Sequence, residues 1–226
     1  MIIELKDVNK REISRYLGYR GNQPDEQVER LIDEVLSELL NKIQPKNIYK
    51  IYSAKAQGNE VSLFDKDLSV PSMTIVSRNF SENVKSCSYV VLMAATLGLE
   101  ADKLLHKYEI INMTKASIVQ ACGAAAIEAY CNKIQEEIRI NALEKGLYLR
   151  PRFSPGYGDL PLDRQQDIFE LLECTKRLGI TLTDSLLMYP TKSVTAFIGM
   201  TTEKQGCHIA KCSQCKNTEC EFRNED

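Results

Sequence analysis

The twelve residues from 150 to 161 constrain the fold of this chain more than any other segment. Their sequence is Arg-Pro-Arg-Phe-Ser-Pro-Gly-Tyr-Gly-Asp-Leu-Pro, which contains three prolines and two glycines. Proline fixes φ and lacks a backbone N–H, so the segment can neither continue a helix nor lie inside a sheet. Glycine adopts backbone conformations that other residues avoid. The sequence therefore predicts a stiff, shaped loop between regular elements.

Three side chains on this loop indicate a capacity for binding. Arg150, Arg152 and Tyr157 bring two cations and a phenol to one short segment. A rigid segment with a few convergent polar groups suits an anionic or amphoteric small molecule. The alternative is a surface turn that carries its arginines by chance, and the sequence alone leaves both interpretations open.

Composition and charge argue against several function classes. The net charge is −2, the basic residues are dispersed and tryptophan is absent, so nothing indicates a nucleic-acid-binding face. The uncharged runs of the chain, such as 116–127, are too short to span a bilayer. The first residues carry no secretory signal pattern. We therefore expect a cytoplasmic protein with no nucleic-acid or membrane partner, whose eight cysteines are thiols or metal ligands before they are disulfides.

Hydrophobic periodicity predicts helices and strands in an irregular order. Helical patterns cover 25–43, 113–140 and 163–177, and a further amphipathic helix leads toward His106. Strand patterns cover 48–54, 61–64, 89–95 and 194–198. Because strands and helices do not alternate regularly, the pattern favours an α+β fold. We divide the chain into an N-terminal part (1–84), a core (85–200) and a cysteine-rich tail (201–226).

The tail carries four of the eight cysteines within fourteen residues, at Cys207, Cys212, Cys215 and Cys220. So short and polar a segment cannot build a hydrophobic core. Four thiolates at this spacing match a tetrahedral zinc site or an iron–sulfur cluster, and the sequence does not decide between the two metals. Reduced or disulfide-linked cysteines without a metal are the alternative.

The remaining cysteines and the histidines suggest no catalytic centre. Cys87, Cys122, Cys131 and Cys174 lie in apolar contexts and are expected to be small core residues. The two histidines are far apart in the sequence, which does not support a histidine-based triad. Neither a glycine-rich dinucleotide fingerprint nor a phosphate-binding loop is found.

From the loop onward the chain resembles the activation domain of cobalamin-dependent methionine synthase. The R-x-x-x-G-Y motif of residues 152–157 carries the resemblance, which covers most of residues 85–200. It looks in particular like the free-standing form of that domain in anaerobic bacteria. The other segments that carry it are Pro161, 167–172, 179–183, Met188-Tyr-Pro190, Ser193-Val194 and a preceding helix at 124–130.

The resemblance implies a C-shaped single domain with a twisted, mainly antiparallel sheet flanked by helices, which binds S-adenosylmethionine in a groove. It also implies a role in reactivating methionine synthase. A flavodoxin or ferredoxin supplies one electron to the oxidised cobalt, and S-adenosylmethionine supplies the methyl group that traps the reduced form. The chain lacks the Asp-x-His-x-x-Gly loop that holds cobalamin in such enzymes. Cobalamin is therefore expected only in trans on a partner, with this chain as an accessory subunit of a methyltransferase.

The resemblance also implies which residues hold the ligand. Arg152 would bind the carboxylate, since a guanidinium matches it with two hydrogen bonds. Glu128 would oppose the ammonium or sulfonium group, and a salt-bridged helix face is the alternative. The backbone of 154–156 would meet adenosine or the methionine part, and Tyr157 would lie near the methyl group. The expected set is Arg152, Ser154, Pro155, Gly156, Tyr157 and Glu128.

The chain departs from the family pattern at several contacts. The family's adjacent tyrosines after the last strand align near Gly206-Cys207, and its amine-binding aspartate has Asn9 as the nearest counterpart. Arg150, Tyr189 and Lys192 are weaker candidates. The alternative function is a reactivator or docking module for a corrinoid protein, with a metal-binding (Fe–S or Zn) tail and no S-adenosylmethionine chemistry.

Overall fold

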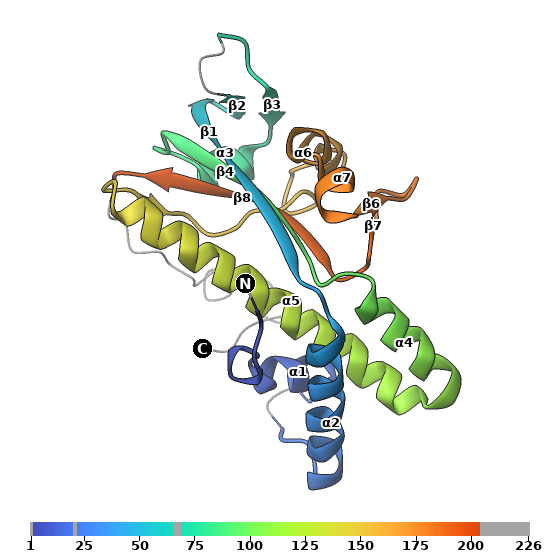
Figure 1. The fold of residues 1–226 in the computed structure, drawn as a ribbon. Helices are drawn as coiled ribbons and strands as arrows, with labels where there is room; N and C mark the ends of the chain where they lie inside the picture. Colours follow the sequence, from blue (N-terminus) through green and yellow to red (C-terminus); the bar gives the residue numbers. More distant parts are fainter. Residues whose placement is uncertain (1, 20–21, 66–68, 204–226) are drawn as a thin grey trace.

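A six-stranded sheet runs through the middle of the molecule (Figure 1). The computed structural model describes residues 2–19, 22–65 and 69–203. The strands of this sheet are β1 (Lys46–Gln57), β2 (Glu60–Phe64), β3 (Met73–Val76), β4 (Tyr89–Thr96), β5 (Tyr148–Leu149) and β8 (Ser193–Thr201). Their order is β3-β2-β1-β4-β8-β5, and every neighbouring pair is antiparallel. Two short strands, β6 (Thr181–Leu182) and β7 (Met188–Tyr189), form a separate ribbon.

Strand β4 lies between β1 and β8 in the sheet. β4 pairs with β1 from Ser53↔Tyr89 to Lys46↔Thr96, and with β8 from Tyr89↔Met200 to Thr96↔Ser193. β4 reads as an unbroken apolar run because both of its faces are buried. Alternate side chains of β4 and β8 therefore belong to two different hydrophobic cores.

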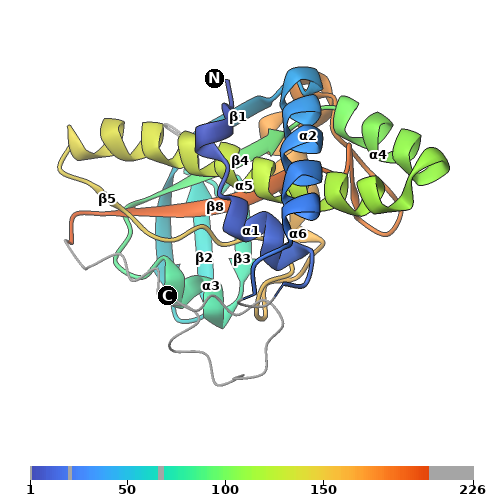
Figure 2. The ribbon, with the colours of Figure 1, turned by 90° about the horizontal axis from the view of Figure 1, so that it is seen from below.

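The first core lies between the sheet and four helices. These helices are α1 (Lys10–Tyr16), α2 (Glu26–Lys42), α4 (Glu100–Ile111) and α5 (Met113–Leu143). Figure 2 shows α5 crossing the face of β4 and β8, with α1 and α2 on its outer side. The first half of α5 is rich in small residues, which lets the neighbouring elements approach closely. At Gly123 an added Cβ would lie 2.8 Å from Cε of Lys192.

The second core fills the opposite face of the sheet. It contains α3 (Arg78–Asn83), α6 (Arg164–Leu172) and α7 (Cys174–Leu178), together with the inner sides of β1, β2 and β3. Three phenylalanines meet there: the ring of Phe80 lies 5.8 Å from that of Phe153 and 4.8 Å from that of Phe197. This aromatic cluster joins α3 and β8 to the loop that follows β5.

The predicted α+β fold with a mainly antiparallel sheet is confirmed, and one helix prediction is corrected. The expected helix over 163–177 consists of two helices, α6 and α7, because Glu173 between them has a φ of 52°. The apolar spacing continues through both helices, so periodicity could not reveal the break. Strand β3 and helix α3 follow a polar segment and were not predicted. Within the described residues, no helix combines the length and apolarity needed to cross a membrane.

Substituting Gly199 tests the close packing behind β8. A Cβ at Gly199 would lie 2.6 Å from Sγ of Cys87 and 3.2 Å from Cγ of Arg150. We expect Gly199→Ala to lower the free energy of unfolding by about 1–3 kcal/mol, because the short cysteine side chain cannot move aside. Chemical denaturation of the single variants and of Gly199→Ala combined with Cys87→Ala gives the coupling energy. Strictly additive effects would contradict a direct clash.

Candidate functional site

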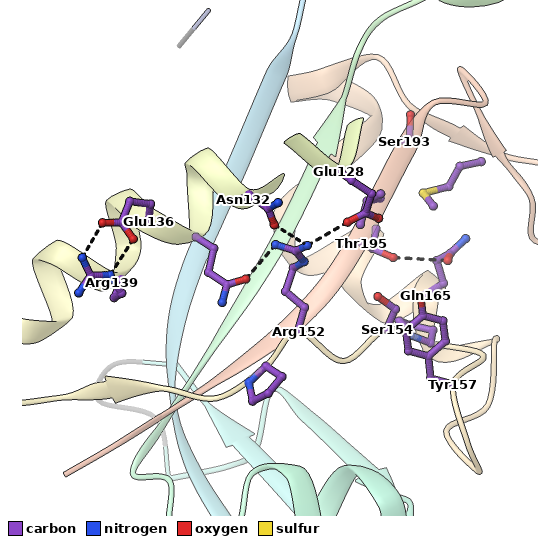
Figure 3. Close-up of a pocket in the computed structure, with 15 residues that line it drawn as sticks. Glu128, Asn132, Glu136, Arg139, Arg152, Ser154, Tyr157, Gln165, Ser193 and Thr195 are labelled. Carbon is purple, nitrogen blue, oxygen red and sulfur yellow. Dashed lines mark hydrogen bonds and ion pairs between the residues drawn. The ribbon is translucent and has the colours of Figure 1, made fainter. Parts of the chain in front are cut away.

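A pocket of about 770 Å³ lies between helix α5, the loop after β5 and the start of β8 (Figure 3). Its wall thus combines elements that are distant in the sequence but lie next to one another in the fold. The lining residues are Glu128, Asn132, Gln135, Glu136, Arg139, Pro151, Arg152, Ser154, Pro155, Tyr157, Gln165, Met188, Ser193, Val194 and Thr195.

Helix α5 contributes one polar edge to the pocket. Glu128, Asn132, Gln135 and Arg139 follow one another at intervals of four, three and four residues, which places them on one side of the helix. Glu136 also lines the pocket and accepts two hydrogen bonds from Arg139. The remaining sides of the first half of α5 are buried in the first core. The pocket therefore has charged groups of both signs along one helix.

Arg152 lies across from this edge, with its side chain about 20% exposed. Its Nη1 donates to Oε1 of Gln135 at 2.8 Å. Its Nη2 donates to Oε2 of Glu128 and to Oδ1 of Asn132, both at 2.9 Å (Figure 3). Three acceptors from α5 thus hold the guanidinium in place, and Glu128 keeps 48% of its side chain exposed.

The loop that carries Arg152 is attached to the sheet by its neighbour Phe153. The backbone of Phe153 exchanges two hydrogen bonds with Phe197 of β8, at 2.9 and 2.8 Å. The Phe153 side chain enters the second core. Since side chains alternate along extended backbone, Arg152 and Ser154 face the pocket on the other side. The sheet therefore determines where the guanidinium lies.

A tight turn follows and ends at the pocket rim. Gly156 has a φ of 87°, and its N–H donates to the carbonyl of Leu160 at 2.9 Å. The ring of Tyr157 lies edge-on to that of Phe153, with centroids 6.2 Å apart, and remains 57% exposed. The turn thus places Tyr157 at the rim of the pocket while its backbone stays hydrogen-bonded.

Gln165 is a buried polar group in the pocket wall, with 4% exposure. Its Nε2 donates to the carbonyl of Leu186 at 2.8 Å, and its Oε1 accepts from the hydroxyl of Thr195 at 3.4 Å. These bonds join α6 to the segment before β7 and to β8. Gln165 and Thr195 therefore give the apolar inner wall a pair of fixed polar atoms.

The structure brings together most of the residues that the sequence predicted for the site. Five of the predicted six line the pocket, and Gly156 forms the turn between two of them. Three lining residues of α5 were not predicted, Asn132, Gln135 and Arg139, although polar residues at helical spacing after Glu128 were a usable signal. Gln165 was not predicted either, because it looks like an ordinary helix-start residue in the sequence.

The weaker candidates Arg150, Tyr189 and Lys192 lie outside the pocket lining, and so does Asn9. Arg150 donates to the carbonyl of Lys85 and pairs with Glu203. The stem of Lys192 packs against α5, and burial lowers the pKa of its ammonium group. Asn9 caps α1 by accepting from the N–H of Arg11 at 3.0 Å.

The predicted metal ligands cannot be placed. Cys207, Cys212, Cys215 and Cys220 lie outside the described residues. Among residues 2–19, 22–65 and 69–203, no group of three or more histidine, cysteine, aspartate or glutamate side chains is arranged to hold a metal ion.

Most of the chain matches a known protein family. The model of the family described as vitamin B12-dependent methionine synthase, activation domain, matches residues 25–224. The chain belongs to this family. The matched range includes the pocket and also the segment that carries the tail cysteines. A comparison with curated proteins gives no match.

Solved structures share the fold of this activation-domain chain. A crystal structure of the MetH reactivation domain bound to AdoHcy superimposes with a TM-score of 0.69 at 19% sequence identity. The alignment covers 88% of this chain and 75% of that one. The fold is therefore retained although four of every five aligned residues differ.

The four cysteines of the described region are buried free thiols, as predicted. Cys131 lies on α5 and belongs to the first core. Burial raises the pKa of Cys131 to about 12, and the charge of Arg152 acts in the opposite direction. Burial likewise raises the pKa of Cys122 and of Cys174 to about 12. At neutral pH these thiols remain protonated and cannot act as nucleophiles.

Alkylation tests this assignment. We expect iodoacetamide at pH 8 to leave Cys122, Cys131 and Cys174 unmodified in the native protein and to modify them after denaturation, because the reagent needs an accessible thiolate. Mass spectrometry of proteolytic peptides separates these positions from the tail cysteines. Fast native modification of Cys131 would show that the first core is open to the reagent at this position.

Proposed function

We propose that the pocket binds S-adenosylmethionine and that the protein serves in the reductive reactivation of cobalamin-dependent methionine synthase. The observation that carries this proposal is the meeting of Arg152, Ser154 and Tyr157 of the R-x-x-x-G-Y loop with Glu128 in one pocket of an activation-domain chain. The related reactivation domain of similar fold was crystallised with AdoHcy, which is S-adenosylmethionine without its methyl group.

The charges in the pocket suit both ends of the methionine part of the ligand. S-adenosylmethionine carries a carboxylate, an ammonium group and a sulfonium group. Arg152 would bind the carboxylate, which would take the place of one of its present acceptors on α5. Glu128, released from this contact, would then face the ammonium or sulfonium group. The ion pair between Arg152 and Glu128 already gives each of these charges a partner at the pocket wall.

The turn residues would hold the rest of the ligand. Ser154 and Pro155 line the pocket directly, so their backbone would contact adenosine or the methionine part. Gly156 would allow that close approach because its hydrogen atom replaces a side chain. The exposed ring of Tyr157 would stack or hydrogen-bond beside the methyl group.

The chemistry would require a partner that carries cobalamin. Cobalamin held by methionine synthase or a related corrinoid protein would supply the cobalt that accepts the methyl group, after one electron from a flavodoxin or ferredoxin. The contribution of this chain would be to orient the sulfonium methyl group toward the cobalt of the partner protein and to exclude water from the polar edge of α5. AdoHcy would remain in the pocket as the product.

Arg152→Ala tests the ligand-binding assignment. We expect its affinity for S-adenosylmethionine and AdoHcy in calorimetric titration to fall at least about tenfold, since a charge-assisted pair is lost. Arg30→Ala is the matched control, because Arg30 also pairs with a glutamate on a helix surface but lies on α2, outside this pocket. Failure of the wild-type chain to bind either compound would favour a docking module without S-adenosylmethionine chemistry.

Glu128→Gln distinguishes the two roles open to this carboxylate. If Glu128 faces the sulfonium group, the substitution should weaken binding of S-adenosylmethionine, which carries this charge, several-fold more than binding of AdoHcy, which lacks it. The size of the difference follows from titrating each compound against both proteins under one buffer and salt condition. Equal losses would assign Glu128 to the ammonium group, and unchanged affinities would leave it as a partner of Arg152 alone.

The metal content of the full chain tests the tail hypothesis. We propose that Cys207, Cys212, Cys215 and Cys220 bind zinc or an iron–sulfur cluster, on the strength of their spacing. Protein purified without oxygen should then contain stoichiometric metal, with charge-transfer absorbance if the metal is iron. Cys212→Ser combined with Cys215→Ser should abolish it. One equivalent of zinc without iron would remove an electron-relay role, and metal-free protein would overturn the hypothesis.

A further inference from the structure

The carboxylate of Asp159 joins the pocket loop to a distant helix. Its Oδ2 accepts from the N–H of Arg78 at 2.8 Å, and its Oδ1 accepts from the N–H of Asn79 at 3.1 Å and from the hydroxyl of Ser77. Ser77 is the N-cap of α3 and also accepts from the N–H of Phe80. Three donors at the start of one helix thus converge on a single loop side chain some eighty positions away in the sequence.

A second contact fixes the same junction. Gly158 has a φ of 56°, and a Cβ at this position would lie 3.0 Å from Cγ of Asn79. The loop backbone therefore approaches α3 more closely than a side chain would allow. Beneath this contact, Phe80 of α3 packs on Phe153 at the start of the loop. The loop therefore contacts α3 at two places, through Phe153 at its start and through Gly158 after the turn.

Asp159 is not suited to contact the ligand itself. It is absent from the pocket lining, and its two oxygens already accept three hydrogen bonds from α3. The hydrogen bond from Ser77, followed by those from the backbone, lowers the pKa of this carboxyl. A lowered pKa means that the contact is complete at neutral pH and weakens only when the pH falls through that low value.

The turn connects this anchor to the pocket rim. Tyr157 precedes Asp159 by two residues, and its carbonyl accepts from the N–H of Leu160 at 3.0 Å. Tyr157 is half-exposed, and its ring touches only the edge of Phe153 among the aromatic contacts of the described residues. The position of this ring thus depends on its backbone, which Asp159 ties to α3.

We propose that Asp159 is a positioning residue: it anchors the loop to α3 and so holds Tyr157 at the rim of the pocket, without touching the ligand. This inference rests on the proposed function, because the molecule whose affinity it sets is S-adenosylmethionine or AdoHcy. Tyr157 is the residue through which Asp159 acts.

Titration calorimetry with AdoHcy tests the consequence for binding. We expect Asp159→Ala to weaken binding about tenfold and Asp159→Asn to weaken it less, because the amide keeps one acceptor oxygen. Asp163→Ala is the matched control: this carboxylate lies four positions further along, pairs with the adjacent Arg164 and does not line the pocket. Affinity that is unchanged in Asp159→Ala, whatever happens to its melting temperature, overturns the proposal.

A double-mutant cycle separates positioning from a general structural effect. If Asp159 acts by placing Tyr157, then Asp159→Ala should cause little further loss in a Tyr157→Ala background. Losses that simply add would assign the effect of Asp159 to the fold as a whole and overturn the positioning role.

Hydrogen exchange tests the anchor without any ligand. Asp159→Ala should speed amide exchange in peptides covering 156–160 and 78–80, while peptides from β4 keep the wild-type rate. Unchanged exchange in both segments overturns the anchor. If the wild-type chain bound no AdoHcy, the proposed function and the effect on affinity would both fail, and exchange would still decide whether Asp159 holds the loop.

Discussion

The burial of β4 and β8 on both faces is the constraint on which the rest of the structure depends. Because alternate side chains of these strands belong to different cores, helix α5 must cover one face while α3, α6 and α7 cover the other. The pocket lies where the loop after β5 faces helix α5. Phe153 pairs with β8 and fills the second core, and the residues beside it are left facing α5. The position of the pocket therefore follows from how the two faces of the sheet are covered.

The charged side chains of the pocket are held in place by hydrogen bonds to one another and to neighbouring polar side chains. Arg152 has three acceptors on α5, and Arg139 is bound by Glu136 one turn further on. Such pairs contribute little to stability when they are half-exposed. Under the proposed function their value would be positional, since each guanidinium and carboxylate would already face the oppositely charged group of an amphoteric ligand. Binding would then exchange partners rather than create order in flexible side chains.

The sequence could predict the central strands, the long helices and most of the pocket, because these depend on local patterns. The proline-rich loop marked the site, and its R-x-x-x-G-Y motif located Arg152 and Tyr157. The break at Glu173 could not be predicted, because a left-handed residue inside a continuous apolar pattern leaves no periodic signal. Gln165 was missed for a different reason: its burial follows from contacts with Leu186 and Thr195, which only the tertiary structure brings near.

The spacing of the polar residues on α5 has a consequence for how the length of this helix can change. Consecutive helical residues are rotated by about 100°. One residue inserted between Gly123 and Glu128 would turn the polar edge away from Arg152, although every side chain would keep its identity and the loop would be untouched. Under the proposed function, ligand binding would therefore depend on the rotational phase of α5 as well as on the residues that the helix carries.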